Sequence, residues 1–445
     1  MVHRVGSGPR RICLLTVTIL LAMASIARAE SAAPPKFDGA DTAWLLLSSV
    51  LVLMMTIPGL ALFYGGMVRR KNVLSTLMQS FILVAVVSIQ WVIFGYSVAF
   101  APGSALAGSF AWVGLSGVSA SVPYASYSAT VPHQAYMVYQ CMFAIITPAL
   151  ITGAIAERMS FKGFLLFSIL WTTLIYDPLA HWVWGVGGWI HDLGALDFAG
   201  GTVVHISSGA AALAGALLLG KRRGYLREPM PPHNLTLTIT GAGLLWVGWF
   251  GFNAGSALAA NGLAVSTFVA THMGAAAATL AWVIAEWFVA GKPTTLGAAS
   301  GAVAGLVAIT PASGYVGPIS AIVIGAAAGV VCFSAVRMKT RLGYDDALDV
   351  VGVHMVGGIL GALLTGVFAS IAINSAGANG LLFGNARQLA VQAIAVVASV
   401  VFSFVGSSIL LVITRALVGI RVSDEAEQTG LDLSEHEESA YAFEA

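Results

Sequence analysis

The sequence predicts an all-α integral membrane protein with eleven transmembrane helices, the N-terminus outside the cell and the C-terminus inside. Three observations predict this class: the composition, the apolar stretches and the distribution of lysine and arginine. Of the 445 residues, 58% are hydrophobic and only 9% are charged, and the mean hydropathy is +0.87. Such a composition excludes a soluble globular chain. The basic residues form no patch of the nucleic-acid-binding kind, so we expect a lipid bilayer around the chain and no nucleic acid partner.

Eleven apolar stretches are long enough to cross a bilayer, which takes about 20 helical residues. They cover residues 42–67, 73–100, 133–155, 163–189, 198–220, 234–257, 264–290, 295–312, 316–336, 347–373 and 386–414. Each of these stretches is expected to form one membrane-spanning helix.

The first 29 residues are a separate segment. Three arginines precede a short apolar run, residues 12–26, which ends in the small-residue sequence ARA. This pattern is typical of a cleavable signal peptide, predicted here over residues 1–29, and the alternative is an uncleaved twelfth span. Cleavage would leave the new N-terminus on the outer side of the membrane.

Lysine and arginine near span ends favour the cytoplasmic side of a membrane. With an outer N-terminus, fifteen of the seventeen lysines and arginines beyond residue 29 fall in segments predicted to be inside. The exceptions are Lys36 and Arg387, and the long outer loop from Ala101 to Thr130 contains none. The charge distribution therefore agrees with the signal peptide and the span count, and it places residues 422–445 inside.

A short motif, V-H-x-x-x-G, occurs in the fifth span as Val204–Gly209 and in the tenth as Val353–Gly358. His205 is near the outer end of its span, whereas His354 is near the inner end of its own. The two helices are five spans apart and run in opposite directions, which predicts an inverted five-plus-five repeat with the eleventh span outside it.

Three interpretations of these histidines remain open. Each imidazole could hydrogen-bond a neighbouring helix, the pair could bind a metal or haem, or the pair could line a pathway. The surrounding sequence has no Cys, Glu or third His at ligand spacing, and nothing places His181 or His272 nearby. We therefore expect no metal site and favour a pathway.

Aromatic and polar residues gather at the predicted outer ends of several spans. The set comprises Tyr139, Phe143, Trp184, Asp197, Trp249, Phe252 and Ser256. Helical spacing places Tyr139 and Phe143 on one helix face, and the last three residues of the set on another. Ring faces, one hydroxyl and one carboxylate at the same depth suit a small cation.

Six ordered motifs extend over almost the whole chain beyond residue 29. They are IPGLALFYGGMVRRKNVLS (57–75), GAIAERM (153–159), AHWVWG (180–185), GALDFAGGTVVH (194–205), GWFGFNAGSA (248–257) and DVVGVH (349–354). Through them the sequence resembles the Amt/Mep/Rh family of ammonium transporters. The resemblance implies a cofactor-free transporter in the inner (cytoplasmic) membrane, not an enzyme, with a transporter domain over residues 30–421 that assembles as a homotrimer.

The resemblance also implies roles at the outer mouth. Trp184 and Ser256 match the outer ammonium site of the Amt branch, and Asp197 matches the buried carboxylate that supports it. Phe143 and Phe252 match the stacked rings that close the outer mouth.

Other positions are carried over to the pore and its two ends. His205 and His354 match twin histidines in a narrow pore, and Asp349 matches an acid near its inner end. Tyr139 occupies a place where the family often has phenylalanine, and Trp249 is a supporting ring. The implied mechanism is that ammonium loses its proton at the outer mouth and ammonia crosses the pore, with net proton transfer left open.

Residues 422–445 carry eight acidic side chains and no lysine or arginine. A solvated, disordered tail is one interpretation. The resemblance implies another, a regulatory segment on the cytoplasmic face that helps a PII-type signal protein close the pores. Two further function classes stay open: an ammonium receptor with the same fold, and a redox or metal protein built on the two histidines.

Overall fold

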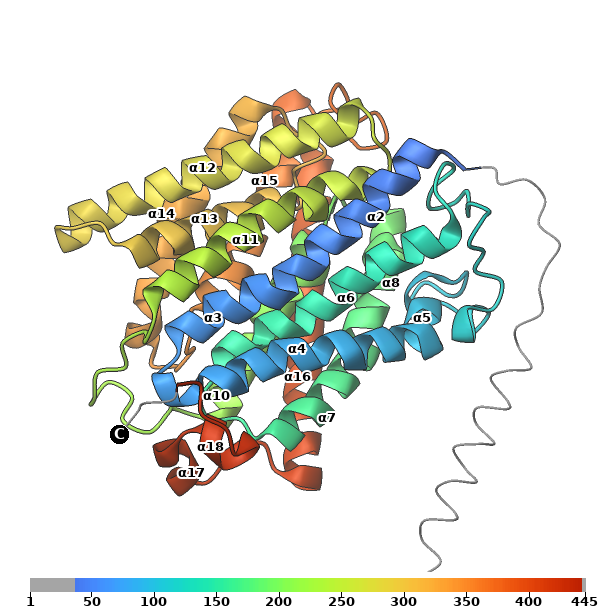
Figure 1. The fold of residues 1–445 in the computed structure, drawn as a ribbon. Coiled ribbons are helices and arrows are strands. Elements are labelled where there is room, and N and C mark those ends of the chain that lie inside the picture. The colour runs from blue at the N-terminus through green and yellow to red at the C-terminus, as the bar shows by residue number, and fades with distance from the viewer. Residues whose placement is uncertain (1–36, 442–445) are drawn as a thin grey trace, which may run out of the picture. The chain divides into compact units, whose positions relative to one another are not determined.

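The computed structural model describes residues 37–441 of the chain (Figure 1). The predicted signal peptide, residues 1–29, lies outside the described residues. Helices dominate this part of the chain, and its β-structure is limited to three isolated bridges. The α-helices are α2 (Gly39–Met54), α3 (Ala61–Met67), α4 (Val73–Gln90), α5 (Tyr96–Phe100), α6 (His133–Ile155), α7 (Phe161–Trp171), α8 (Asp177–Trp184), α9 (Trp189–Leu193), α10 (Ser207–Leu219), α11 (Leu235–Ala254), α12 (Gly262–Ala290), α13 (Thr295–Ile309), α14 (Pro318–Leu342), α15 (Val356–Phe368), α16 (Ala386–Val418), α17 (Asp424–Thr429) and α18 (Leu431–His436).

Ten helical segments of residues 37–441 are long and apolar enough to cross a membrane, and α13 is an eleventh, shorter apolar helix. All eleven coincide with the predicted stretches. The largest difference is at the end of α14, which continues six residues beyond the predicted end to Leu342. Its last turns contain Arg337, Lys339 and Arg341, which form helix readily but do not count as apolar. The chain is therefore an all-helical, multi-pass membrane protein.

Several membrane helices contain a π-helical turn, in which the backbone hydrogen bonds join residues five apart instead of four. These turns are η1 (Met55–Leu60), η3 (Trp91–Gly95), η5 (Thr172–Tyr176), η6 (Gly201–Ile206) and η8 (Val351–Met355). Such turns occur frequently at functional sites. Each histidine of the repeated motif lies in a π-helical turn, His205 in η6 and His354 in η8.

The two histidine segments pack against each other reciprocally. Each π-turn leads into an α-helix of 13 residues, α10 after η6 and α15 after η8. Helix α10 packs on η8, and α15 packs on η6. Gly209 makes this approach possible, because a Cβ atom there would collide with the backbone of Met355. The inverted repeat as a whole remains a prediction, but its two motif helices are neighbours.

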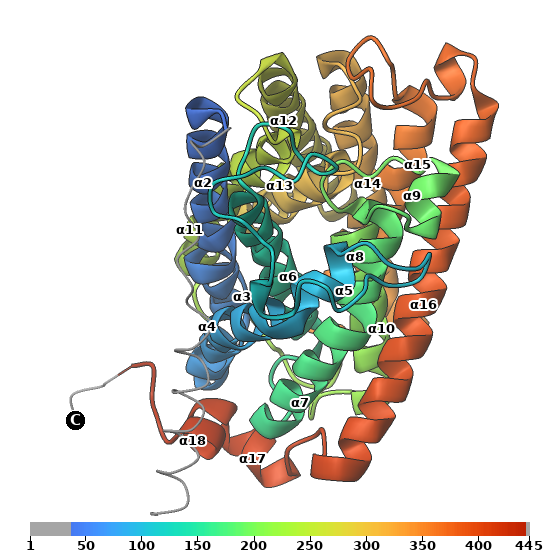
Figure 2. The same cartoon turned by 90° about the vertical axis from the view of Figure 1, so that its right-hand side faces the viewer.

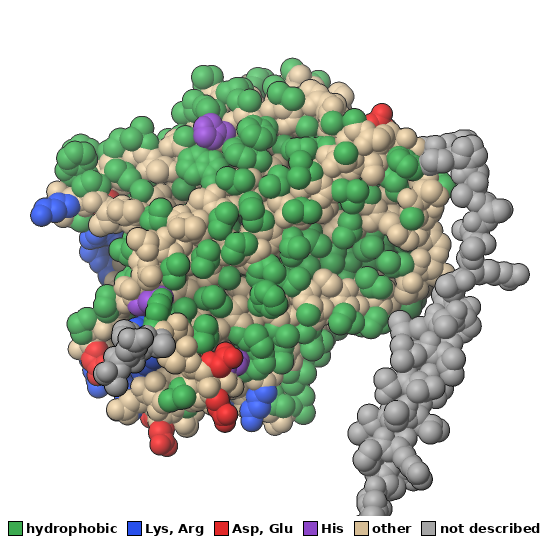
Figure 3. Space-filling model, viewed as in Figure 1, with side chains coloured by type: hydrophobic (Ala, Val, Ile, Leu, Met, Phe, Trp, Pro, Cys, Tyr) green, Lys and Arg blue, Asp and Glu red, His purple; other side chains and the backbone are tan. Residues whose placement is uncertain are grey.

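Helices α17 and α18 define one end of the bundle, which we call the tail end (Figure 2). Lysine, arginine, aspartate and glutamate side chains gather there on a surface that is otherwise largely hydrophobic (Figure 3). The loop that contains residues 101–132 lies at the opposite end.

The acidic tail is folded up to Tyr441 and is not a disordered extension. The Asp432 carboxylate accepts a hydrogen bond from Ser75 N (2.8 Å) in the first turn of α4, and Leu431 N donates to Asn72 Oδ1 (2.9 Å). The Glu435 carboxylate accepts from Phe161 N (2.8 Å), the first residue of α7. Carboxylates are favourable at helix N-termini, so the acidic residues attach the tail to two membrane helices.

Candidate functional site

His205 and His354 lie side by side in the interior of the bundle. Their Nδ1 atoms are 3.3 Å apart, and the ring centroids are separated by 5.4 Å. Both side chains are buried, with 1% and 3% exposure. Because one Nδ1 must donate and the other accept, the neutral rings carry opposite tautomers. Their two Nε2 atoms therefore present one acceptor and one donor, and the Nε2 of His205 has no partner among residues 37–441.

The paired rings border a small cavity of about 10 Å³, lined otherwise by Trp249, Phe252 and aliphatic or aromatic side chains such as Leu60 and Val303. This volume corresponds to about one small molecule. The histidines are its most polar groups, so a species inside it can hydrogen-bond only to them or to the Trp249 ring. The Trp249 N–H is already occupied, because it donates to Thr310 Oγ1 (2.8 Å).

Two phenylalanine rings separate this cavity from a much larger one. Phe143 on α6 and Phe252 on α11 have centroids 4.3 Å apart with 30° between the ring planes. Phe252 lines the histidine cavity, whereas Phe143 lines a vestibule of about 560 Å³ at the end opposite the tail. The rings therefore form the partition that a solute would have to cross.

Four of the seven residues predicted at the outer ends of the spans line the vestibule, namely Phe143, Trp184, Asp197 and Ser256. Trp184 lies 5.9 Å from Phe143, and its indole N–H donates to the backbone oxygen of Asp197 (2.9 Å). Ser256 also lines the vestibule, where its hydroxyl donates to the backbone oxygen of Phe252 (2.9 Å). Its oxygen remains able to accept, so a cation here meets ring faces and one hydroxyl oxygen.

The Asp197 side chain is nearly buried, and its carboxylate accepts hydrogen bonds from backbone N–H groups. It accepts hydrogen bonds from Gly200 N (2.8 Å), Gly201 N (2.6 Å), Thr202 N (2.7 Å) and the Thr202 hydroxyl. These bonds cap the first turn of η6, the segment that carries His205. The carboxylate therefore fixes the helix entry at the edge of the vestibule, which Asp197 also lines.

A third cavity, of about 20 Å³, lies on the tail side of the histidines. His354 lines it together with Tyr64 and Asp349. The Asp349 carboxylate forms an ion pair with Lys339 of α14. Neighbouring Asp346 accepts from Val351 N (2.8 Å), and burial raises the pKa of its carboxyl to about 6. The three cavities thus follow one another from the vestibule to the tail side, with the histidine pair between the second and the third.

Comparisons with known proteins show the family of this chain. The sequence profile described as Ammonium Transporter Family matches residues 43–441. The chain belongs to the ammonium transporter family. It is 52% identical over 402 residues to an ammonium transporter of Bacillus subtilis, with 90% of this chain and 98% of the relative covered. Membership of this family makes the chain a transporter rather than an enzyme.

Solved structures share the fold. Mep2 of Candida albicans superimposes with a TM-score of 0.83 at 37% identity, covering 88% of each chain. A structure described as a sensor Amt protein superimposes with a TM-score of 0.82 at 27% identity, covering 89% of this chain and 98% of that one.

Tyr139, predicted at the substrate site, lies behind the vestibule wall. Its side chain is 1% exposed, and it is absent from the vestibule lining. Its hydroxyl lies 3.1 Å from Ser256 Oγ and 2.8 Å from the backbone oxygen of Phe252. A tyrosine here can therefore orient the serine hydroxyl, which phenylalanine cannot do.

Asp177, an acid in the sequence YDPLAHW, lines neither the vestibule nor the outer surface. The residue is fully buried at the start of α8, and one carboxylate oxygen accepts from Gln90 Nε2 (2.6 Å). Gly95 leaves room for both groups, because a Cβ atom there would lie 2.7 Å from Gln90 Oε1. The acid joins two membrane helices at their π-turns.

Sequence reasoning missed several residues of the path. Lys339 pairs with Asp349, and Tyr64 lines the cavity on the tail side with its hydroxyl donating to Leu150 O (3.1 Å). Gln140 and Tyr136 line the vestibule. The sequence shows Lys339 as a charged residue near the end of the ninth predicted span. It does not show that the partner is Asp349, which lies outside α14. Within residues 37–441, no cluster of three or more His, Cys, Asp or Glu side chains could hold a metal ion.

Proposed function

We propose that this chain recruits ammonium in the vestibule, removes a proton there and conducts ammonia past His205 and His354. The observation that carries the proposal is the order of the three cavities, with the Phe143–Phe252 partition before the histidines and Asp349 after them. Trp184 and Ser256 are the substrate-binding residues of this proposal, with Asp197 in support.

Elementary electrostatics favours proton loss before the pore. A bare monovalent cation in an apolar cavity of this size loses most of its hydration, which costs many kcal/mol. Ammonium can avoid that cost by giving up a proton, whereas potassium cannot. Neutral ammonia then donates to one histidine nitrogen and accepts from the other, a pattern that the opposite tautomers supply.

The proposal also includes the topology, the membrane location and the oligomeric state of the chain. The tail end faces the cytoplasm, residues 1–29 direct export, and the transporter resides in the inner membrane as a homotrimer with one pore per subunit. Support comes from the fifteen lysines and arginines on the tail side of the spans and from the polar tail surface.

The decisive experiment uses purified protein in liposomes. An inward ammonium gradient should evoke transport that an equal potassium gradient does not, followed by luminal pH and by membrane current. His205→Ala should change this response, and His272→Ala, which alters an exposed histidine of α12 that lines none of the three cavities, should not. Equal responses to ammonium and potassium in the wild-type protein would contradict the proposal.

The tail is proposed to transmit closure by a PII-type protein. Glu427 accepts from Arg223 N and pairs with Arg421, so the tail contacts the loops that join the membrane helices. Deleting residues 429–445 should leave transport intact but reduce its inhibition by added PII-type protein. Full inhibition of the truncated protein would remove the tail from this role.

A sensor is the second candidate, favoured by the likeness to the solved sensor Amt protein. Saturable ammonium binding without flux in the liposome assay would support it over transport.

A further inference from the structure

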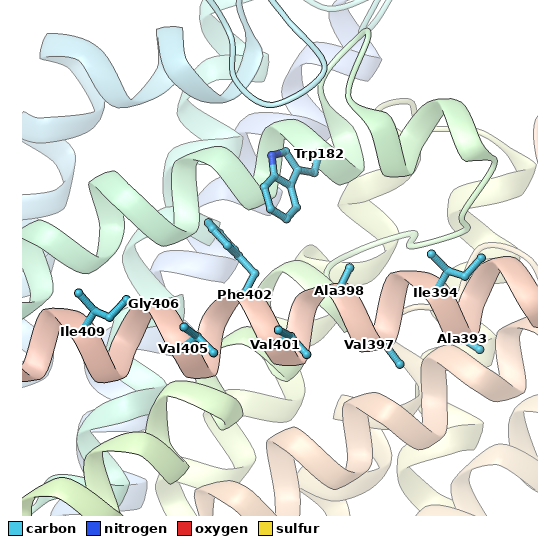
Figure 4. A pocket seen from close by; sticks show the side chains of 10 residues that line it. All are labelled: Trp182, Ala393, Ile394, Val397, Ala398, Val401, Phe402, Val405, Gly406 and Ile409. Atoms are coloured by element: carbon cyan, nitrogen blue, oxygen red, sulfur yellow. The ribbon is translucent and has the colours of Figure 1, made fainter.

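Helix α16 has two unlike faces. Its exposed face borders an apolar groove of about 850 Å³, where side chains such as Val397 and Phe402 lie with Trp182 of α8 (Figure 4). Acyl chains meet no unpaired polar group there, because the Trp182 N–H donates to Leu106 O (2.8 Å). The buried face carries a row of polar residues, namely Gln388, Gln392, Ser399, Ser403, Ser407 and Thr414. Spacings of four and seven residues place them along one side of the helix.

Gln392 on this buried face holds a stretch of irregular backbone. Residues 194–200, between α9 and η6, are not helical, so their N–H and C=O groups need partners elsewhere in the protein. Leu196 N donates to Gln392 Oε1 (2.7 Å), and Gln392 Nε2 donates to Leu196 O (2.8 Å). One side-chain amide therefore satisfies both backbone groups of Leu196, as a paired residue in a neighbouring β-strand would do.

The same amide reaches a third element. Gln392 Nε2 also donates to Ala362 O (3.0 Å) of α15, the helix that follows the histidine turn η8. Gln388, one turn earlier, donates to Gly194 O (3.0 Å) and lies 3.4 Å from Gln392 Oε1. Gln392 is 1% exposed, and both of its N–H groups and its oxygen bond within the protein. It has no group left for another molecule, so it can act only by fixing the residues that it bonds.

Leu196 is adjacent to the residue that supports the proposed ammonium site. The backbone oxygen of Asp197 accepts from the Trp184 indole N–H (2.9 Å). The Asp197 carboxylate accepts from the N–H groups of Gly200 and Gly201, which open η6. A shift of Leu196 would therefore move the acceptor of Trp184 and loosen the first turn of η6. Cation–π attraction depends on where the ring face lies, so a displaced ring binds a cation less well.

We propose that Gln392 is a positioning residue for the ammonium site. Through it α16, the helix outside the predicted repeat, fixes the backbone on which Trp184 and Asp197 depend. The inference rests on the proposed function, because Trp184 binds ammonium only in that proposal. It adds a residue that touches neither the substrate nor the vestibule but sets how well the vestibule captures ammonium.

Ammonium uptake by proteoliposomes gives the first test. Gln392→Met keeps the length of the side chain but removes its donor and acceptor groups. Half-saturation for ammonium should rise several-fold, while the maximal rate stays close to wild type. Ser407→Ala is the control, because Ser407 lies on the same face of α16 but accepts from Trp171 Nε1 (2.8 Å) of α7. Wild-type half-saturation in Gln392→Met, or an equal rise in Ser407→Ala, would overturn the proposal.

A double-variant comparison shows whether Gln392 acts through Trp184. In a Trp184→Leu background, Gln392→Met should raise half-saturation little further, because the ring whose position Gln392 sets is already gone. A merely structural loss would raise it by the same factor in both backgrounds, and that result would overturn the positioning role. If Gln392→Met does not fold, Gln392→Glu replaces it, since an ionised carboxylate still accepts from Leu196 N but lacks both donors.

Backbone amide exchange tests the positioning without reference to ammonium. Hydrogen exchange measured by mass spectrometry should be several-fold faster in Gln392→Met than in wild type for residues 194–202, and unchanged for α6 and α12. Equal exchange of residues 194–202 in the two proteins would overturn the proposal. Wild-type vesicles without any ammonium response would contradict the proposed function alone, and the exchange rates would still decide whether Gln392 fixes this segment.

Discussion

Two groups of buried polar side chains, the histidine pair of the proposed pore and the Arg222 cluster at the tail end, differ in their partners. In the pore, two buried histidines share a single hydrogen bond, and one Nε2 atom has no partner among residues 37–441. At the tail end, the Arg222 guanidinium donates to both Glu157 (3.0 Å) and Asp345 (2.9 Å), and all three side chains are nearly buried. Glu157 also pairs with Arg69 at 2.9 Å.

The ion pairs of the Arg222 cluster, Arg222 with Glu157 and Asp345, distinguish it from the histidine pair. Burial would raise the pKa of the Glu157 and Asp345 carboxyls, but the neighbouring guanidiniums outweigh it and lower both values. These charges are fully compensated and bind nothing further, so they hold the loops of the tail end together. The histidine pair, by contrast, keeps one ring nitrogen that has no partner among residues 37–441 and could bond to another molecule.

The largest effect is expected from Arg222→Met, which removes the charge shared by the two buried carboxylates. Breaking a buried ion pair costs about 3 to 5 kcal/mol of folding stability. Thermal unfolding in detergent would measure it, with Arg227→Met as the control because Arg227 is exposed. Similar unfolding temperatures for the two variants would show that the cluster is not structural.

The same substitution should change how stability depends on pH. In the wild type the pKa values of Glu157 and Asp345 are lowered from 4.5 and 3.8, so their stabilisation is complete above those values and is lost only as the pH falls below them. Without Arg222, burial should raise both pKa values, and stability should then fall as the pH rises through the raised values. Unfolding temperatures between pH 5 and 8 test this, and a flat profile in Arg222→Met would contradict it.

An intermediate effect is expected in the pore. His354→Ala leaves His205 without its partner, at a cost of about 1 to 3 kcal/mol that a large bundle can tolerate. Folding should survive, while ammonia conduction falls or potassium enters as water fills the gap. Liposome currents for each single variant and for His205→Ala/His354→Ala should show less than additive effects, since the two rings act as one unit. Wild-type selectivity in the double variant would return both histidines to a packing role.

The smallest effect is expected in the vestibule. Trp184→Leu removes one ring face, and a cation–π contact at a partly exposed site is worth about 0.5 to 2 kcal/mol. Half-saturation for ammonium should therefore rise by about 2- to 30-fold, with little change in stability, because 1.4 kcal/mol is a factor of ten. Uptake measured against ammonium concentration checks it, and an unchanged curve would exclude Trp184 from the binding site.

The sequence alone determined the eleven helices and the residues near the path, because both depend on local patterns. Apolar length gives the spans, helical spacing places Trp249, Phe252 and Ser256 on one face, and the repeated motif marks His205 and His354. Such signals need no knowledge of which helices are neighbours.

Only the tertiary structure decided how these residues meet. Tyr139 lies behind Ser256 and not in the vestibule, Lys339 pairs with Asp349, Asp177 is joined to Gln90, and the acidic tail is folded against α4 and α7. Each of these contacts joins separate elements, and the π-turns at η6 and η8 set the directions of both pore histidines. Hydropathy indicates which residues are buried but not which residues they contact. The contacts depend on how the helices pack against one another.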